Sequence, residues 1–247
     1  RALYCSTTQF PSMVNVYLLT GVELSAIGPE IAAIAQSTKP IAILFSDASA
    51  ILDVEYLDTQ MATYEALCFS GQGLDFITEE QIRNGELENY DMVVVAGARN
   101  VEDSTIEGLN EYLANGGKLL RIGEGTLSEN QWGHPRGSFE GGVTLTFESM
   151  DDLHASIQKA LAEMSMLPEL QVVKKGSNDT LGLFHRSAEL NGERLLFIAN
   201  FGSQSTPVEV KDGGAKIESA LDTLTGQQED LSDLVLEPWE VRLWKIQ

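Results

Sequence analysis

The sequence predicts an α/β protein, in which a doubly wound parallel sheet is followed by a small antiparallel β-sandwich. Three observations lead to this prediction. Short apolar runs alternate with helical patterns up to Pro168, which is typical of βαβ units. After Pro168 the pattern changes to the period of two that strands show. Residues 92–96 (MVVVA) are apolar throughout, as expected for a central parallel strand.

Residues 1–38 precede the first predicted strand and form a lead-in segment. One helix is predicted in it, at residues 29–36 (PEIAAIAQ). Pro29 suits the first turn of that helix, because the N–H that proline lacks would have no partner there.

The sheet unit is predicted to span residues 39–167 and to begin with a buried strand at residues 41–45 (IAILF). The next segment, residues 55–70, places four residues at helical spacing and predicts a helix that Gly71 ends. These four residues are Leu57, Met61, Tyr64 and Cys68.

The other elements of this unit alternate in the same way. Further strands are predicted at residues 74–77, 92–96, 118–122 and 143–147. Asp103 or Ser104 caps a helix that ends at residues 115–117 (NGG). Residues 149–152 (SMDD) resemble a capping box and open a last helix. Its predicted inward-facing residues are Leu153, Ile157, Leu161 and Met164.

The second unit is predicted to span residues 168–247 and to consist of short antiparallel strands. Its clearest signal is Asn191-Gly192, which predicts a hairpin between the strands at 181–187 and 194–200. Further strands are predicted at residues 206–210, 216–221 and 240–246, with a turn at residues 212–214.

The charge of the chain excludes some partners. The 247 residues include 16 Lys and Arg against 37 Asp and Glu, which gives a formal net charge of −21. A surface this acidic repels phosphate, so we expect no nucleic-acid partner. It also disfavours an anionic membrane, and no apolar run approaches the roughly 20 residues that span a bilayer. We therefore expect no membrane partner.

Motifs for cofactors and metals are missing from the sequence. Neither GxGxxG nor GxxxxGK[ST] occurs, so no cofactor is expected. His154 and His185 lack metal-ligand spacing to a second His or Cys, so no metal is expected either. Cys5 and Cys68 are too few for a disulfide framework.

Asp47 is a candidate at the edge of the sheet, because ligands of open α/β sheets bind beyond the carboxyl ends of the strands. An aspartate in this place can act as a nucleophile or a Mg²⁺ ligand. Position 49, where such sites place a second aspartate, is serine. We therefore interpret Asp47 as a helix cap or a loop acid.

The turn Gly123-Glu124-Gly125 resembles the tight turn that presents a nucleophile in hydrolases and amidotransferases. Glu124 occupies the nucleophile position, and a carboxylate cannot begin acyl transfer as a thiol or hydroxyl does. His134 lies a few residues further on, but it has no nucleophile to activate. The turn is interpreted as a degenerate nucleophile elbow, so no catalytic residue is assigned.

Trp132, in the loop of residues 130–137 (NQWGHPRG), is a candidate for binding substrate. Aromatic rings stack on the apolar faces of sugars. Packing under its own loop, or at a subunit contact, is the alternative for this side chain.

Several stretches resemble glycoside hydrolase family 42 β-galactosidases. Residues 40–46, 64–81, 87–96 and 113–121 resemble the trimerisation domain of those enzymes. Residues 182–200, 222–226 and 236–246 resemble their small C-terminal β domain. The resemblance implies a flavodoxin-like domain related to class I glutamine amidotransferases but lacking their catalytic cysteine, which agrees with Glu124 in the elbow.

The resemblance also implies where catalysis would occur. Family 42 enzymes carry both catalytic glutamates on a (β/α)₈ barrel, which this sequence does not contain. We therefore expect a C-terminal fragment or a stand-alone relative, with residues 1–38 matching the segment that joins the barrel to the trimerisation domain. A galactoside substrate would be bound only by the missing barrel.

The leading functional hypothesis is a non-catalytic oligomerisation and scaffold region that assembles as a homotrimer. One alternative is a small amidotransferase-like hydrolase that uses Asp47, Glu124 or His134. The other alternative is a carbohydrate-binding accessory protein that uses Trp132 or the β domain.

Overall fold

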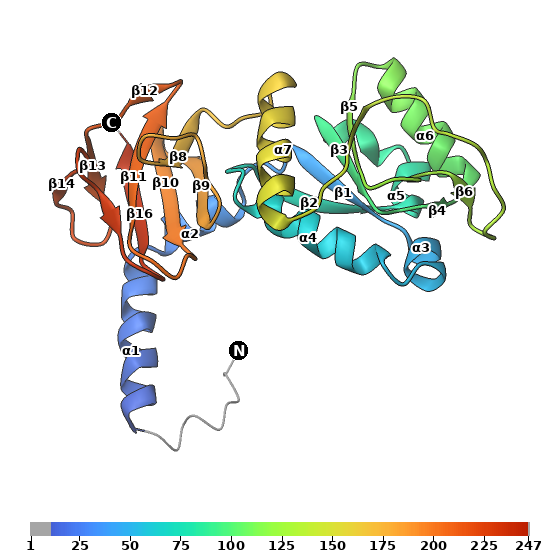
Figure 1. The fold of residues 1–247 in the computed structure, drawn as a ribbon. Coiled ribbons are helices and arrows are strands. Elements are labelled where there is room, and N and C mark those ends of the chain that lie inside the picture. Colours follow the sequence, from blue (N-terminus) through green and yellow to red (C-terminus); the bar gives the residue numbers. More distant parts are fainter. Residues whose placement is uncertain (1–10, 247) are drawn as a thin grey trace.

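The computed structural model describes residues 11–246, and its ribbon is drawn in Figure 1. An α/β unit lies beside a unit of antiparallel sheets, and helix α1 extends away from the second unit. The coarse prediction of a parallel sheet with helices followed by antiparallel strands is confirmed.

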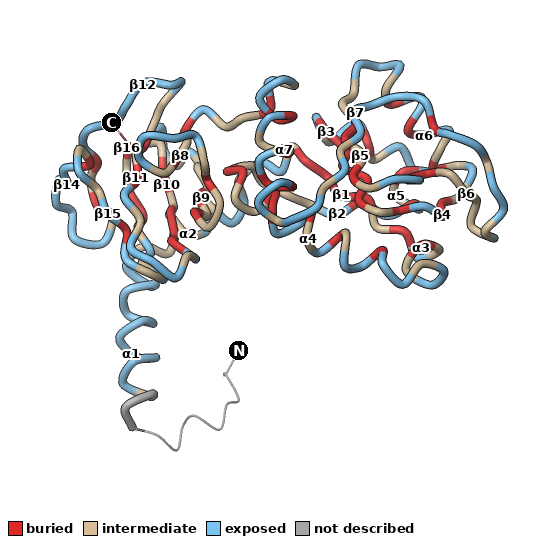
Figure 2. The backbone as a smooth tube through the Cα atoms, viewed as in Figure 1, coloured by how far each residue is buried: buried red, intermediate tan, exposed pale blue. Residues whose placement is uncertain are grey.

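The described part of the lead-in, from residue 11 on, contains two helices, α1 (Pro11–Ala26) and α2 (Gly28–Ala35), where the sequence predicted only the second. Most of α1 from Asn15 onward is exposed (Figure 2), and its exposed residues include the large apolar Val16, Leu18 and Val22. In the described residues no single helix is long and apolar enough to cross a membrane. The pair Val14–Ala26 and Gly28–Ala35 passes that test jointly but is bent by 78°.

The parallel sheet has five strands in the order β2-β1-β3-β5-β7. These strands are β1 (Ile41–Phe45), β2 (Leu74–Thr78), β3 (Met92–Ala96), β5 (Lys118–Ile122) and β7 (Val143–Leu145). Strand β3 is buried along its whole length, because the sheet is covered on both faces. The continuous apolar run that predicted this strand therefore corresponds to a central position.

Helices cover both faces of this sheet. They are α3 (Asp47–Leu52), α4 (Tyr56–Cys68), α5 (Glu79–Arg83), α6 (Asp103–Ala114) and α7 (Met150–Glu163), with the 3-10 turn η2 (Glu86–Asn89). Leu67 of α4 and Leu161 of α7 belong to one core cluster, whereas Leu109 of α6 belongs to the other. Two separate cores on opposite faces confirm the doubly wound arrangement.

Half of the capping box predicted for α7 forms, because the Asp152 carboxylate accepts from the N–H of Glu148 and not from that of Ser149. The side chain of Ser149 accepts a hydrogen bond from Asp152 N. Leu153, Ile157 and Leu161 are buried as predicted. The period of 3.6 residues explains this result, because positions four apart share one face of a helix.

The second unit consists of two antiparallel sheets. One has the order β14-β13-β16-β10-β9, and the other contains β12-β11-β15 with β8 paired to β11. The strands are β8 (Leu170–Lys174), β9 (Leu183–Leu190), β10 (Glu193–Asn200), β11 (Thr206–Asp212), β12 (Ala215–Lys216), β13 (Ser219–Asp222), β14 (Gln228–Asp230), β15 (Val235–Leu236) and β16 (Val241–Ile246). Both sheets contribute to one core around the buried Trp244. Residues 216–221, expected to be one strand, are instead divided between the end of β12 and the start of β13, and residues 217 and 218 lie in neither strand.

The hairpin of β9 and β10 forms at Asn191-Gly192, as predicted. Both turn residues have positive φ, 53° and 82°. A type I′ turn needs positive φ at both central residues, which Asn and Gly tolerate best. The local sequence thus determines both this turn and the register of the hairpin.

Candidate functional site

A crevice lies at the carboxyl edge of the parallel sheet and has a volume of about 470 Å³. Asp47 and Trp132, both singled out in the sequence, lie in its wall. Its lining residues are Phe45, Asp47, Ala48, Ile51, Thr78, Glu79, Glu80, Arg83, Glu102, Gln131 and Trp132. The crevice therefore combines the ends of β1 and β2 with the distant loop that follows β6 (Glu129–Asn130), at the edge where open α/β sheets bind ligands.

A buried carboxylate supports the floor of this crevice. Oε1 of Glu79 lies 2.7 Å from the Ser46 hydroxyl, and Oε2 accepts a 2.7 Å hydrogen bond from the Thr105 hydroxyl. The backbone N–H of Glu102 donates to the same Oε2. Glu79 is only 8% exposed, and its oxygens are occupied by these donors. Buried carboxylates need such donors. Glu79 therefore connects α5 to the end of β1 and to the start of α6.

Replacing Glu79 with glutamine is expected to lower the free energy of unfolding by about 1–2 kcal/mol. The amide keeps the shape but replaces one acceptor oxygen with an NH2 donor that faces other donors, and it loses the charge that strengthens these bonds. Chemical denaturation at neutral pH measures the change. Glu80→Gln is the matched control, because the neighbouring Glu80 is exposed. Equal stability of the two variants would contradict the structural part given to Glu79.

The Trp132 loop is held against the sheet by several polar contacts. The Asn130 side chain accepts hydrogen bonds from the backbone N–H groups of Trp132 and His134, each 3.0 Å long. Arg136 donates to the carbonyls of Glu129 and Val101 and pairs with Asp103. Trp132 nevertheless remains 74% exposed. A fixed loop thus presents an indole ring to solvent at the crevice.

The structure brings some of the predicted residues together and leaves others apart. Asp47 begins α3, but Ser46 is the residue whose side chain caps that helix, by accepting from Ser49 N. His134 is exposed and does not line the crevice. The sequence places Glu79 at the carboxyl end of the strand at 74–77, but it did not single out Gln131, whose position at the crevice depends on contacts between distant segments.

The turn of residues 123–125 lies after β5, and it continues toward the short strand β6 rather than into a helix. Gly123 and Gly125 have positive φ, whereas Glu124 has an ordinary φ and is exposed. A nucleophile elbow places its nucleophile on a strained turn between strand and helix. The residue with positive φ directly after the strand is Gly123, which has no side chain to react.

The two buried histidines lie away from this edge. The ring of His154 contacts the Ala66 carbonyl and the Thr180 hydroxyl, and His185 is buried next to Gly71. Burial lowers the pKa of both imidazoles, that of His185 to about 4. Within residues 11–246 no group of three His, Cys, Asp or Glu side chains is placed to hold a metal ion.

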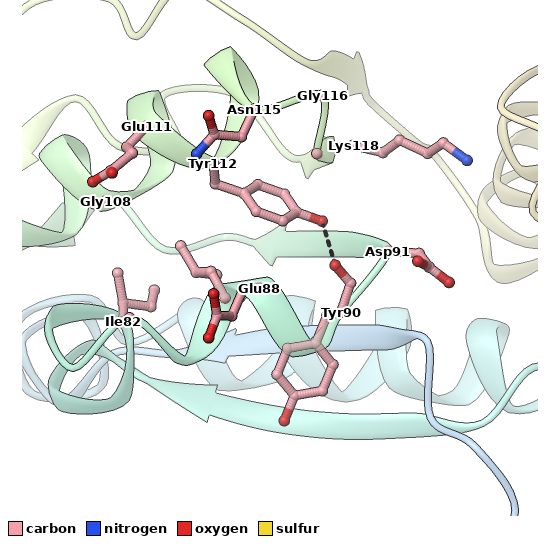
Figure 3. Close-up of a pocket in the computed structure, with 13 residues that line it drawn as sticks. Ile82, Glu88, Tyr90, Asp91, Gly108, Glu111, Tyr112, Asn115, Gly116 and Lys118 are labelled. Carbon is pink, nitrogen blue, oxygen red and sulfur yellow. Dashed lines mark hydrogen bonds between the residues drawn. The ribbon is translucent and has the colours of Figure 1, made fainter.

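A second hollow, of about 570 Å³, lies at the amino edge of the sheet between α6 and the segment of α5 and η2 (Figure 3). The Tyr112 hydroxyl donates to the Tyr90 carbonyl across it. A Cβ at Gly117 would come within 2.4 Å of the Tyr112 ring. Gly117 is thus required for packing, whereas Gly116, with a φ of +91°, supplies the left-handed residue that follows the end of the helix.

Comparison with known proteins gives a match in fold only. No protein-family model matches the sequence, and no curated protein matches it. An exo-carrageenase of family GH42 from Bacteroides ovatus is 22% identical, with a TM-score of 0.78 over 98% of this chain and 34% of that chain. A β-galactosidase from Bacillus circulans sp. alkalophilus is 16% identical, with a TM-score of 0.62 over 92% of this chain and 44% of that chain.

A GH42 β-galactosidase from G. stearothermophilus is 14% identical, with a TM-score of 0.63 over 85% of this chain and 40% of that chain. The chain thus spans 34–44% of the length of these three structures. The expected resemblance to part of a family 42 enzyme is confirmed at the level of the fold.

Proposed function

We propose that this chain is a non-catalytic assembly region of a GH42-like glycoside hydrolase, which holds copies of the enzyme together. The observation that carries the proposal is an exposed apolar face on α4. It is formed by Val54, Leu57, Met61, Tyr64 and Phe76, and we call it the α4 face.

The α4 face is continuous because of its helical spacing. Leu57, Met61 and Tyr64 follow one another at intervals of four and three residues, which places them on one side of the helix. Tyr64 stacks on Phe76 of the edge strand β2, with ring centroids 5.6 Å apart. Met61 is 65% exposed and Val54 is 93% exposed. Large exposed apolar patches are rare on monomers, and they mark interaction sites.

The turn that follows β5 supports a non-catalytic role. In the described residues that follow β5, the turn offers Gly123 and Glu124 where a hydrolase of this topology would present Ser or Cys. The strand order β2-β1-β3-β5-β7 is the order typical of flavodoxin-like sheets. It supports a flavodoxin-like domain that has kept the architecture of the amidotransferases without their chemistry. A galactoside substrate would then be bound by a catalytic barrel outside this chain.

The assembly is proposed to be a cyclic homotrimer. Three copies related by rotation can each place the α4 face against a different surface of the next copy, which closes the ring. Because every copy carries a net charge of −21, like charges approach one another on assembly. Salt that screens this repulsion is expected to favour the trimer.

We expect the chain to have the mass of three 26.9 kDa copies in solution and Met61→Glu to have the mass of one copy. A carboxylate at the centre of the α4 face would have to be buried without a partner, which costs several kcal/mol (on the order of 3–5) at an interface. Light scattering after size exclusion measures the mass at two salt concentrations. Leu224→Glu is the control, since Leu224 is 46% exposed in another part of the chain.

The outcomes separate the two claims. A wild-type chain that stays monomeric at every concentration and salt would contradict the assembly function. A trimer that withstands Met61→Glu, or dissociates equally with Leu224→Glu, would contradict the choice of the α4 face and leave the function intact.

A further inference from the structure

We propose that the crevice at the carboxyl edge is a binding site for a neutral sugar, with Trp132 as the stacking platform. The inference goes beyond assembly and does not depend on the α4 face. It joins three features of this crevice: an indole held in the open, exposed carboxylates that accept hydrogen bonds, and walls that carry four carboxylates and one guanidinium.

The indole is held ready for a ligand. The Asn130 side chain fixes the backbone at Trp132 and His134, and Arg136 fastens the base of the same loop. Because the loop is already held, little backbone freedom would be lost on binding. A 74% exposed Trp at a crevice offers the flat apolar surface on which the C–H face of a pyranose ring packs.

The polar groups of the crevice favour a ligand that carries several hydroxyl groups. Asp47 and Glu80 are exposed carboxylates in its wall. Carboxylate oxygens accept hydrogen bonds, so these side chains can bind the hydroxyl groups of an occupant. A sugar supplies several O–H donors beside an apolar ring face.

The charge of the walls selects against acidic sugars. Four carboxylates line the crevice, namely those of Asp47, Glu79, Glu80 and Glu102. The one cationic side chain among its lining residues is that of Arg83, which already lies 3.4 Å from a Glu102 oxygen. A sulfate or carboxylate on the ligand would meet a field of its own sign in a partly desolvated site. The site therefore fits an uncharged hexose or short neutral oligosaccharide, for which about 470 Å³ is sufficient.

The experiment is titration of the full chain with methyl β-galactoside, followed by saturation-transfer NMR and calorimetry. We expect saturable binding with a Kd of about 1 mM, in the range of a small ligand with few anchors. Trp132→Ala should weaken it at least tenfold, and Trp132→Phe should keep part of it because a ring remains. Methyl galactoside 6-sulfate should bind at least tenfold more weakly than the neutral sugar.

Trp239→Ala is the matched control, because Trp239 is another exposed indole, 68% accessible, in the β unit. The inference is overturned if the neutral sugar does not saturate the wild-type chain, or if Trp132→Ala binds it unchanged. It is also overturned if Trp239→Ala removes binding, which would move the site to the β unit. If Trp132→Ala lowers the oligomeric mass and leaves sugar binding unchanged, the loop is a protein contact and the inference is overturned. A monomeric chain that still binds sugar through Trp132 would uphold this inference while contradicting assembly.

Discussion

Replacing Gly71 with alanine is expected to lower the free energy of unfolding by about 3 kcal/mol, from overpacking and left-handed strain together. Gly71 has a φ of +83° and lies between α4 and β2. A Cβ there would stand 2.2 Å from Nε2 of His185 and 2.8 Å from Cγ of Pro168. His185 is 1% exposed, so the clash falls on a buried ring rather than on the free end of a surface side chain. The added methyl group would press the β unit away from the α/β unit.

Gly85→Ala separates the two causes. Gly85 has the same φ of +83°, but a Cβ there would meet nothing within 4 Å. Only the backbone strain remains, and a loss of about 1 kcal/mol is expected. Urea denaturation of both variants at one pH gives the comparison. If the two variants lose the same stability, the contact of Gly71 with His185 does not constrain the junction of the two units.

Acidification from pH 7 to pH 4 is expected to remove about 3 kcal/mol of stability through His185 alone. Burial lowers the pKa of this imidazole to about 4, the nearby Leu183 carbonyl opposes the shift weakly, and the Arg186 charge adds to it. In the unfolded chain the pKa returns to about 6.5. Between these values the unfolded state binds a proton that the folded state does not bind. The contribution is therefore complete above pH 6.5 and is lost as the pH falls toward 4.

The measurement is the free energy of unfolding at several pH values for the wild type and for His185→Gln. The glutamine does not titrate, so its stability should fall less between pH 6.5 and pH 4. Burial lowers the pKa of His154 as well, and its share of the pH dependence should persist in both proteins. Parallel curves for the two proteins would mean that His185 is protonated in the folded state at mildly acidic pH.

Helix α4 shows what the sequence predicts about an element and what it leaves open. The spacing of Leu57, Met61 and Tyr64 predicts the helix, which forms at Tyr56–Cys68. The same spacing does not tell which side is buried, and the stripe lies in solvent. The buried side includes the more polar Tyr56 and Gln60.

Hydrogen bonds explain the orientation of α4. The side-chain amide of Gln60 donates to the Leu44 carbonyl and to the Tyr56 hydroxyl, and Tyr56 accepts from the backbone N–H of Ser46. Polar groups that find such partners at a strand end can be buried at little cost. Partners of this kind are far apart in the sequence, so the pattern within one helix cannot reveal them.

The candidate site shows the same division. The sequence drew attention to Asp47 and Trp132 separately, from a strand end and from a loop. Their position in one crevice depends on the pairing of the short strands β4 (Asn100–Val101) and β6, which no local pattern predicted. The contacts of the buried Glu79 and the position of Gln131 in the crevice exist only when these segments are together.

By itself the sequence determined the kind and order of the main elements, from the parallel strands to the hairpin at Asn191-Gly192. Periodicity, caps and turn residues are local, because they depend on backbone conformation and on neighbours a few positions away. Only the tertiary structure decided which face of α4 is exposed and which residues line the crevice. Burial and hydrogen-bond partners come from segments distant along the chain, so these features are properties of the folded protein as a whole.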